Sequence, residues 1–463
     1  MRLTSAGVAL LVATGFAAGV AAGPGGDMLA RQFGISPAAA KGVDETEQQT
    51  YGLLTLFGNV FDRVRTDYVE PVTDRTLINN ALNGMLTGLD PHSSYLTEQQ
   101  WHDMQTETTG HFGGIGLEVT DNEGLLEVVS PIDDTPAAKA GLKAGDLVTA
   151  VDGKTVEGLS LNDAVTKMRG DPGTSLRLTV KRPGRDQPLD FTLVRQVIHM
   201  QTVKSQLIGD IGVIRISEFT EQTDPGLRTA LQTLRADSKG HLRGLVLDLR
   251  NDPGGLLDQA ISVSNDFIGH GGIVSTRGRH PEDSQIWYAK PDNVVAGNLP
   301  IVVLVNNGTA SAAEIVSGAL QDDRRALVLG TQSFGKGSVQ TLMPLPGNGA
   351  IRLTTARYYT PSGRSIQGLG ITPDVVVEET RTPVAHFGPE HEADLLHILS
   401  NKGADPSAPP PAVDLPAVAK QIPKLPPEGW PAFDPAKPAT DFQLQQGLLL
   451  VHAMAAGPQA ASR

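Results

Sequence analysis

The amino-acid sequence predicts a multidomain α+β protein, and three patterns along the chain favour this fold class. Apolar residues at helical spacing fill residues 44–108, short β-like runs with glycine-bearing turns fill residues 109–197, and β-like runs alternate with helical ones over residues 198–380. A chain of 463 residues is long enough for two or three folded units. Because such alternation favours a sheet covered by helices, residues 198–380, with some preceding residues, are expected to form a mixed α/β core.

Composition excludes several classes of function. The formal net charge of -13 and the pI of about 5.3 argue against nucleic-acid binding, because neutralising phosphates requires concentrated Lys and Arg. The chain contains no cysteine, which excludes disulfides, thiol catalysis, a cysteine-linked lipid anchor and cysteine-based zinc sites.

Residues 1–23 have the pattern of an export signal. Met1 and Arg2 precede an apolar stretch from Ala6 to Ala22 that ends in small residues. These small residues suit a signal peptidase, and the stretch also suits an uncleaved membrane anchor. The sequence therefore predicts an exported protein, either periplasmic or anchored to the outer face of the cytoplasmic membrane.

Residues 44–108 are expected to contain two or more helices. Apolar residues recur at helical spacing on either side of a break at residues 68–74, which contains Pro71 and two possible helix caps, Thr73 and Asp74. The simplest interpretation is a helical hairpin that packs against the rest of the chain or self-associates.

Residues 109–197 are expected to form a compact domain of mixed type. The segment at 136–146 (PAAKAGLKAGD), followed by Val151-Asp152-Gly153, resembles the signature of a PDZ domain. That resemblance implies a groove in which a bound peptide adds a strand to a sheet edge and its terminal carboxylate meets backbone N–H groups.

Two stretches match this groove. The glycine-rich run that starts at Phe112 matches the carboxylate-binding loop, since glycine lets a ligand approach the backbone closely. A helix expected at 161–168 offers three apolar residues on one face, and ordinary core packing is the alternative role for them. Arg169 is a candidate for binding a carboxylate or relaying groove occupancy. The candidate peptide-binding residues are Phe112, Gly113, Gly114, Ile115, Gly116, Leu161, Val165, Met168 and Arg169.

The tail, residues 381–463, combines a proline-rich linker beyond residue 400 with a short helix expected at 441–455. We expect this helix to contact another surface, such as that of a second subunit.

Ser311 lies where a β-like strand at 301–305 turns into a helical run. A hydroxyl there stands beside a helix N-terminus, whose free N–H groups stabilise developing negative charge. The alternative is structural, because Ser311 and Glu314 also have the spacing of a helix capping box.

A second segment, residues 330–340, places one lysine between glycines in a loop. Lys336 acts as a general base only when neutral, so its pKa must fall from about 10.4 to nearer 7 or 8, at a cost of about 4 kcal/mol. Burial against apolar neighbours supplies such a shift. Gln340 is suited to orienting the lysine, because a carboxylate in its place would raise the pKa of the lysine.

The same loop nearly matches a phosphate-binding P-loop. Gly330 to Lys336 fits the pattern, but Gly337 stands where Ser or Thr must bind magnesium. Nucleotide binding is therefore rejected.

Five segments together resemble the C-terminal processing (tail-specific) peptidase family, over about residues 45–380. They are residues 89–95 (LDPHSSY), 248–255 (DLRNDPGG), 307–314 (NGTASAAE), 330–337 (GTQSFGKG) with Gln340, and 359–368 (YTPSGRSIQG). The resemblance implies a crotonase-like protease core that needs no metal or cofactor and hydrolyses peptide bonds through an acyl-enzyme.

By this resemblance Ser311 is the nucleophile, Lys336 the general base and Gln340 the residue that orients the lysine. The oxyanion would be held by backbone N–H groups of Gly254 or Gly255 and of Ala312. The family more often has asparagine where this chain has Asp252, and we expect the Asp252 carboxylate to point away from the oxyanion.

Two alternatives remain open. Six histidines are scattered without zinc-binding spacing and far from Ser311 in sequence, although a Ser-His-Asp triad assembles from remote segments: His92, His111, His199, His241, His270 and His280. A catalytically inactive PDZ scaffold that only binds peptides is the second.

The expected partners follow from the same resemblance. They are protein or peptide substrates with apolar C-termini, an adaptor or lipoprotein activator, and a second copy of the chain in a homodimer or higher oligomer. No nucleic acid is expected.

Overall fold

The structure is a computed structural model that describes residues 45–456 except 123–124, 133, 157, 160, 186, 382–388, 402–412 and 436. The predicted export segment at 1–23 lies outside the described residues. The chain divides into two compact units, residues 1–81 and 82–463. No helix in the described part of the chain combines the length and the apolar character needed to cross a membrane.

The first described residues are helical, as predicted. Helix α3 (Glu45–Asp67) is followed by α4 (Asp74–Thr87), and the break falls at the predicted proline-containing segment. Thr73 Oγ1 accepts the N–H of Thr76 (3.2 Å) and so caps α4. Helix α3 leaves a set of large apolar side chains exposed: Tyr51, Leu53, Leu54, Leu56, Phe57 and Val60.

A β-sheet with two small helices forms the PDZ region. Its strand order is β3-β4-β5-β7-β8, with β6 paired to β5. The strands are β3 (Leu117–Asn122), β4 (Leu125–Pro131), β5 (Leu147–Val151), β6 (Lys154–Thr155), β7 (Ser175–Lys181) and β8 (Leu189–Val194), and the helices are α6 (Pro136–Ala140) and α7 (Leu161–Met168). Alternate apolar residues of these strands pack with Ala164 and Met168 of α7 into one core.

A two-stranded ribbon connects this region to the rest of its unit. Strand β2 (His111–Gly114) pairs antiparallel with β9 (Gln196–His199). Helix α5 (Glu98–Thr109), which begins with a capping box at Thr97, leads into β2, and the Met200 N–H donates to the Gly110 carbonyl (2.8 Å) at the base of the ribbon.

Residues 203–376 contain a six-stranded sheet of order β10-β11-β12-β15-β16-β19. Strand β10 is antiparallel to β11, and all other neighbours are parallel. The strands are β10 (Val203–Ile208), β11 (Ile211–Ile216), β12 (Gly244–Asp248), β15 (Ile301–Val305), β16 (Leu327–Gly330) and β19 (Val375–Val376). Apolar runs such as 301–305 are buried throughout, as strands covered on both faces require.

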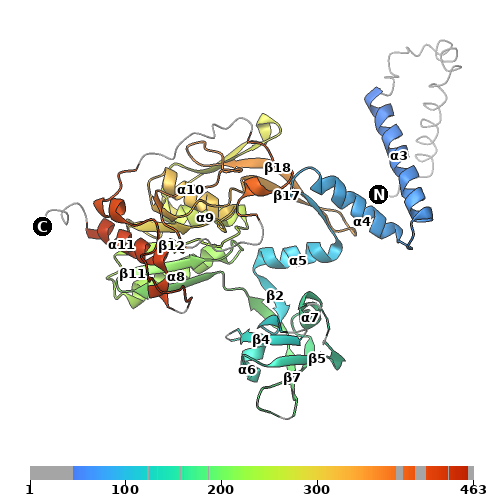
Figure 1. The fold of residues 1–463 in the computed structure, drawn as a ribbon, viewed down its shortest axis with the longest axis horizontal. Coiled ribbons are helices and arrows are strands. Elements are labelled where there is room, and N and C mark those ends of the chain that lie inside the picture. Colours follow the sequence, from blue (N-terminus) through green and yellow to red (C-terminus); the bar gives the residue numbers. More distant parts are fainter. Residues whose placement is uncertain are drawn as a thin grey trace, which may run out of the picture. The chain divides into compact units, whose positions relative to one another are not determined.

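Helices cover both faces of this sheet (Figure 1). Helices α8 (Thr223–Asp237), α9 (Leu257–Phe267) and α10 (Ala312–Asp322) pack on one face, where alternate strand residues such as Leu247 and Val303 form the main core. Helix α11 (Phe442–Ala456) packs on the other face against Val246, Val302 and Leu304. The tail helix is therefore an integral layer of the core, and its apolar residues are largely used within the chain.

A second, antiparallel sheet lies beside the first. Its order is β1-β18-β13-β14, and β17 also pairs with β18. The strands are β1 (Ser94–Leu96), β13 (Gly272–Gly278), β14 (Gln285–Tyr288), β17 (Ser338–Pro344) and β18 (Ala350–Tyr359). Because β1 pairs with β18, residues 44–108, which were expected to contain helices, also contribute a strand to this sheet.

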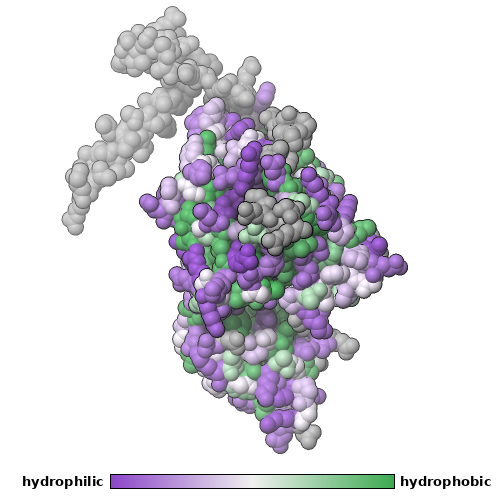
Figure 2. Space-filling view, turned by 90° about the vertical axis from the view of Figure 1, so that its left-hand side faces the viewer, coloured by the Kyte–Doolittle hydropathy of each residue, from purple (hydrophilic) through white to green (hydrophobic). Residues whose placement is uncertain are grey.

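Short 3-10 helices occupy several connections: η2 (Pro281–Asp283), η3 (Pro291–Asn293), η4 (Glu392–Asp394), η5 (Ala417–Gln421) and η6 (Pro438–Thr440). The described tail residues lie against the sheet through η5 and α11. Figure 2 shows polar and apolar residues interspersed over one face of the molecule.

Candidate active site

Ser311 stands at the junction predicted for it, between β15 and α10. Its φ is +51°, a conformation that a non-glycine residue adopts only when its surroundings hold it there. Its side chain is largely buried. The Ser311 N–H donates to Glu314 Oε2 (2.9 Å), so the glutamate half of the predicted capping box is present.

The loop that carries Lys336 is held by the same glutamate. The N–H groups of Gly335 (2.7 Å) and Lys336 (2.9 Å) and the hydroxyl of Ser333 all donate to the Glu314 carboxylate. Ser311 and Lys336 donate their backbone N–H groups to one oxygen atom, Oε2, so these two residues lie side by side. Their side chains, both within the described residues, are not hydrogen-bonded to each other.

Charged neighbours act on Lys336 in opposite directions. Burial lowers the pKa of Lys336 below its ordinary value, and Arg352 lowers it further. The carboxylates of Glu392, Glu314 and Asp90 act to raise it. The lysine is therefore set in a polar, charged environment, whereas the sequence analysis expected apolar neighbours.

Gln340 lies on β17, where its side chain joins a network that involves the 89–95 motif. Its Nε2 donates to Ser338 Oγ (2.9 Å) and to Thr354 Oγ1 (3.4 Å), and the Thr354 hydroxyl donates to Asp90 Oδ1 (3.0 Å). Asp90 also accepts the hydroxyl of Ser93 (2.7 Å). The orientation of Lys336 by Gln340 remains a prediction.

A second network holds the other side of the lysine loop. Gln367 Oε1 accepts the Gly337 N–H (3.1 Å), and Gln367 Nε2 donates to Glu392 Oε1 (3.0 Å). Glu392, which is fully buried, also contacts His92 Nε2 through Oε2 (2.8 Å). These contacts bring the motifs at 89–95 and 359–368 to the lysine loop.

The candidate oxyanion donors lie directly against Ser311. A side chain at Gly254, where φ is +96°, would place its Cβ 2.7 Å from the Ala312 nitrogen and 2.8 Å from the Ser311 Cβ. The Gly254 N–H donates to Asp252 Oδ1 (2.9 Å). Among the described residues, the N–H groups of Gly255 and Ala312 donate to no other group of the protein.

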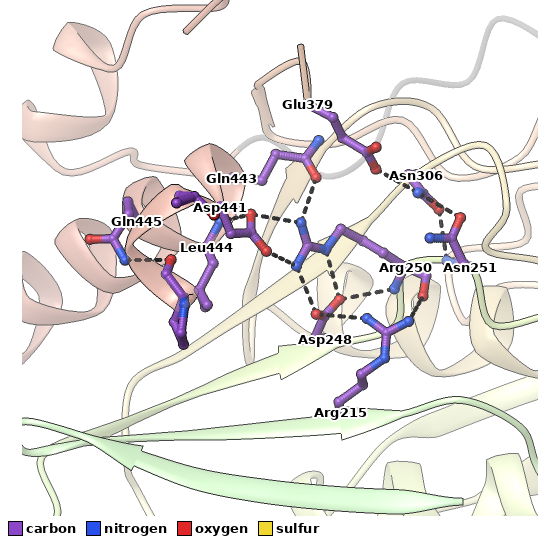
Figure 3. Close-up of polar contacts among 12 residues, drawn as sticks. Arg215, Asp248, Arg250, Asn251, Asn306, Glu379, Asp441, Gln443, Leu444 and Gln445 are labelled. Carbon is purple, nitrogen blue, oxygen red and sulfur yellow. Dashed lines mark hydrogen bonds and ion pairs between the residues drawn. The ribbon is translucent and has the colours of Figure 1, made fainter. Parts of the chain in front are cut away.

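The loop with these glycines is anchored at its start by a buried arginine (Figure 3). The guanidinium of Arg250 binds the Asp248 carboxylate at its own strand end and the Asp441 carboxylate from the tail (2.6 and 2.9 Å), and Gln443 Oε1 accepts a further bond (3.1 Å). Burial acts to raise the pKa of Asp248, but Arg250 and Arg215 hold it below its ordinary value.

Asn251, the next residue, is held by two hydrogen bonds with the side-chain amide of Asn306 (Figure 3). Its N–H donates to Asn306 Oδ1 (2.9 Å), and Asn306 Nδ2 donates to Asn251 Oδ1 (3.0 Å) and to Glu379 (2.7 Å). These bonds hold Asn251 at a φ of +56° and connect the loop that carries Gly254 and Gly255 to the end of β15.

The PDZ residues fall into two groups. Strand β3 is at the edge of its sheet, and Leu161 and Val165 of α7 are partly exposed, as a peptide groove requires. Met168 is buried in the domain core. Ile115 is buried as well, and Gly116 has a φ of +76° at the entry to β3.

The start of the glycine-rich run is part of the ribbon. Phe112, Gly113 and Gly114 belong to β2 and pair with β9. The Gly170 N–H donates to the Gly113 carbonyl (3.1 Å), and the Arg169 guanidinium lies 4.9 Å from the centre of the Phe112 ring. Arg169 is thus placed where α7 meets the ribbon.

Comparison with known proteins identifies the family. Residues 210–377 match the model of peptidase family S41, and residues 127–182 match that of the PDZ domain. A carboxy-terminal-processing protease of Bartonella bacilliformis is 56% identical over 334 residues, which cover 72% of this chain and 77% of that protein. The chain belongs to peptidase family S41.

Two further proteins are also similar to this chain. A probable CtpA-like serine protease of Staphylococcus saprophyticus is 36% identical over 323 residues, which cover 69% of this chain and 64% of that protein. Among solved structures, the photosystem II D1 C-terminal processing protease shares 31% identity with a TM-score of 0.42, over 67% of this chain and 84% of that one.

The structure adds site residues to this S41 peptidase that the sequence analysis did not assign. The sequence predicts Glu314 only as a capping residue, although its place three residues after Ser311 is a usable signal. Asp90 and Gln367 lie in motifs that were noted without a role. Glu392 comes from the tail, and no pattern in the sequence indicates it.

Proposed function

We propose that this S41 peptidase is a serine endopeptidase in which Ser311 and Lys336 form the catalytic pair. Neutral Lys336 Nζ accepts the proton of Ser311 Oγ as this oxygen attacks the peptide carbonyl carbon. The lysine then gives the proton to the leaving amine, which yields an acyl-enzyme and the C-terminal product. Water hydrolyses the ester, and Ser311 recovers its proton.

One observation carries the proposal. The backbone N–H groups of Ser311 and Lys336 share Glu314 Oε2, which brings the only strongly strained serine among the described residues next to a lysine of lowered pKa. The unbonded N–H groups of Gly255 and Ala312 are the proposed oxyanion donors. The Gly254 N–H is already bonded to Asp252, so Gly254 shapes the site by close approach to Ser311.

Substrate capture is assigned to the PDZ groove between β3 and α7. An extended C-terminal segment would pair with the free edge of β3, its carboxylate would meet the backbone at Ile115 and Gly116, and an apolar terminal side chain would contact Leu161 and Val165. Proteins with apolar C-termini are the proposed substrates. The bound tail would then reach Ser311 as an extended strand.

The cellular setting is part of the proposal. The N-terminal pattern favours an exported enzyme, periplasmic or anchored at the outer face of the cytoplasmic membrane. The exposed apolar side chains of α3 favour a homodimer or a higher oligomer, or the binding of an adaptor or lipoprotein activator.

The decisive experiment measures cleavage of an unstructured protein with an apolar C-terminal tail by the wild type, Ser311→Ala and Lys336→Ala. We expect both variants to lose at least about 10³-fold in kcat/KM. Lys204→Ala, a change of an exposed lysine on β10, serves as the matched control and should cleave like the wild type. Circular dichroism confirms that each variant is folded.

His92→Ala separates the lysine base from a histidine base. Since His92 already contacts Glu392, a His-based mechanism predicts that His92→Ala is inactive while Lys336→Ala still cleaves. That result would refute the proposed pair. If the wild type binds C-terminal peptides but cuts nothing, with or without candidate activators, the protein is a peptide-binding scaffold.

A further inference from the structure

Asp252 is a buried carboxyl group for which the catalytic steps above have no use. Its side chain is completely inaccessible to solvent. Oδ1 accepts the Gly254 N–H (2.9 Å), and Oδ2 is buried without a hydrogen-bond partner among the described residues. An ionised carboxylate in such a place leaves a buried oxygen unsatisfied, which is costly, whereas a protonated carboxyl does not carry that charge.

The backbone of Asp252 also contacts the segment that carries Ser311, the proposed nucleophile. The Asp252 carbonyl accepts the Ala310 N–H (2.9 Å), which directly precedes Ser311. Gly254, held by the Asp252 side chain, lies against the Ala312 nitrogen and the Ser311 Cβ. A charge on Asp252 would therefore stand next to the place where the tetrahedral intermediate develops its own negative charge.

We infer that Asp252 is a positioning residue that fixes the oxyanion loop through the Gly254 N–H, and that the site works only while the Asp252 carboxyl is uncharged. The inference rests on the proposed role of Ser311 as nucleophile. It makes the carboxyl a switch, because ionisation of the buried Asp252 adds a negative charge to the loop that carries a proposed oxyanion donor.

The surrounding charges set the pH at which the switch acts. Burial raises the pKa of Asp252 to about 8, and Glu218 on the loop after β11 and Asp248 on β12 act in the same direction. The hydrogen bond from the Gly254 N–H and the charge of Arg215 on β11 act to lower it. Glu314 and Lys336 are two further ionisable groups beside Ser311. Activity is thus expected to rise with pH as Lys336 loses its proton and to fall again above about pH 8.

The test compares pH profiles of kcat/KM for the wild type and Asp252→Asn, whose amide still accepts the Gly254 N–H through Oδ1 but cannot ionise. The substrate is an N-acetylated peptide with an apolar C-terminus and without Lys, Tyr or Cys. Above the pKa of Asp252, which is about 8, we expect kcat/KM of the wild type to fall about tenfold for each pH unit. This gives a loss of about 30-fold at pH 9.5. Asp252→Asn should show no such limb.

Two further variants support the interpretation. Asp252→Ala removes the bond to Gly254 and should lower kcat at every pH with little change in KM. Asp266→Asn removes a different buried carboxyl, on α9, with a pKa also raised to about 8 by burial, and should keep the alkaline limb.

The outcomes are distinct. An unchanged alkaline limb in Asp252→Asn, or no limb in the wild type, overturns the inference and leaves the Ser311 mechanism intact. Cleavage that does not depend on Ser311 overturns the proposed function, and the inference with it. A limb that disappears only in the Asp252 variants supports the switch.

Discussion

Glu314 connects the two proposed catalytic residues, because its carboxylate binds the backbone of both Ser311 and Lys336. Its carboxylate accepts four hydrogen bonds, from Ser333 and from the backbone of Ser311, Gly335 and Lys336. Burial raises its pKa to about 7, and the hydrogen bonds act in the opposite direction. A carboxylate suits this role because both of its oxygens accept hydrogen bonds.

We expect Glu314→Gln to lower kcat by about 10²-fold or more. The amide NH₂ would face N–H donors, so at least one donor loses its partner and the lysine loop moves away from Ser311. Unfolding should also become easier by about 1–3 kcal/mol. Steady-state kinetics and denaturant unfolding measure the two effects, and Glu378→Gln, at an exposed ion pair with Lys424, is the control. Unchanged kcat in Glu314→Gln would mean that the shared carboxylate does not position the pair.

Single residues of this site could be predicted from the sequence only where a local sequence pattern indicates them. Ser311 follows an apolar run and precedes a helical one, and Lys336 stands between glycines, so the sequence predicts both as candidate site residues. The carboxylates of Asp90 and Glu392 act on Lys336 from positions remote in the chain. No spacing rule reports such contacts, because tertiary packing alone brings these segments together.

At the scale of elements, helix α11 is held through Arg250 to the end of β12, where the loop with Gly254 and Gly255 begins. The predicted helix is present, at 442–456, but its surroundings differ from the expectation of a partner-binding tail. The sequence shows that the helix is apolar without showing which surface covers it. Here that surface is the sheet of its own chain.

Asp441→Asn should loosen α11 and weaken the site with it. Removing one partner of a buried ion pair leaves Arg250 partly uncompensated, at a cost of about 3–5 kcal/mol. Denaturant unfolding and the rate of proteolytic removal of α11 report the loss. Asp434→Asn, which breaks an exposed pair with Lys437, should cost less than about 1 kcal/mol. Equal stability of the two variants would contradict the proposed anchor.

The groove between β3 and α7 yields a prediction that separates binding from catalysis. Leu161→Asp should raise KM about tenfold or more for substrates with a free apolar C-terminus, because it removes an apolar contact and adds a charge near the carboxylate. The kcat value and the cleavage of a C-terminally amidated peptide should not change. Val194→Asp, an exposed change on β8 of the same domain, is the control. Equal effects on both substrates would place the groove elsewhere.

At the scale of the whole molecule, buried carboxyl groups make stability depend on pH. The pKa values of Asp252 and Asp266 are raised to about 8 and that of Glu314 to about 7, mainly by burial. Each group binds a proton more tightly when folded, so its contribution is complete below the unfolded pKa near 4 and is lost as pH rises to the folded value. Carboxyls with lowered pKa, such as Asp90, lose their contribution only below about pH 4.

The free energy of unfolding should therefore be higher at pH 5 than at pH 8. Each raised carboxyl contributes a slope of up to about 1.4 kcal/mol per pH unit. Tryptophan fluorescence is a suitable probe, because Trp101, Trp287 and Trp430 all lie outside the PDZ segment at residues 109–197. The three raised carboxyls lie outside this segment as well. The slope should become shallower in Asp266→Asn. A stability that rises between pH 5 and pH 8 would show that these carboxyls are ionised in the folded protein.

The whole-molecule architecture could largely be predicted, since the alternation of apolar runs follows the backbone period of each element. The β1 strand could not, because three residues within a helical region carry too short a pattern. Its partner strand, β18, lies about 250 residues away in sequence, so the two strands meet only in the completed sheet.

The place of α11 has a consequence for the timing of folding. A polypeptide is synthesised from its N-terminus, so residues 442–456 appear only after the strands that they cover. Until then one face of β12 and β15 is bare, and Arg250 lacks Asp441 and Gln443. The segments carrying Ser311 and Lys336 are synthesised more than 100 residues earlier. The loop that follows Arg250, beside Ser311, is nevertheless fully anchored only once α11 is in place. Biosynthesis itself would thus keep the peptidase unfinished while its own unfolded chain is the nearest available substrate.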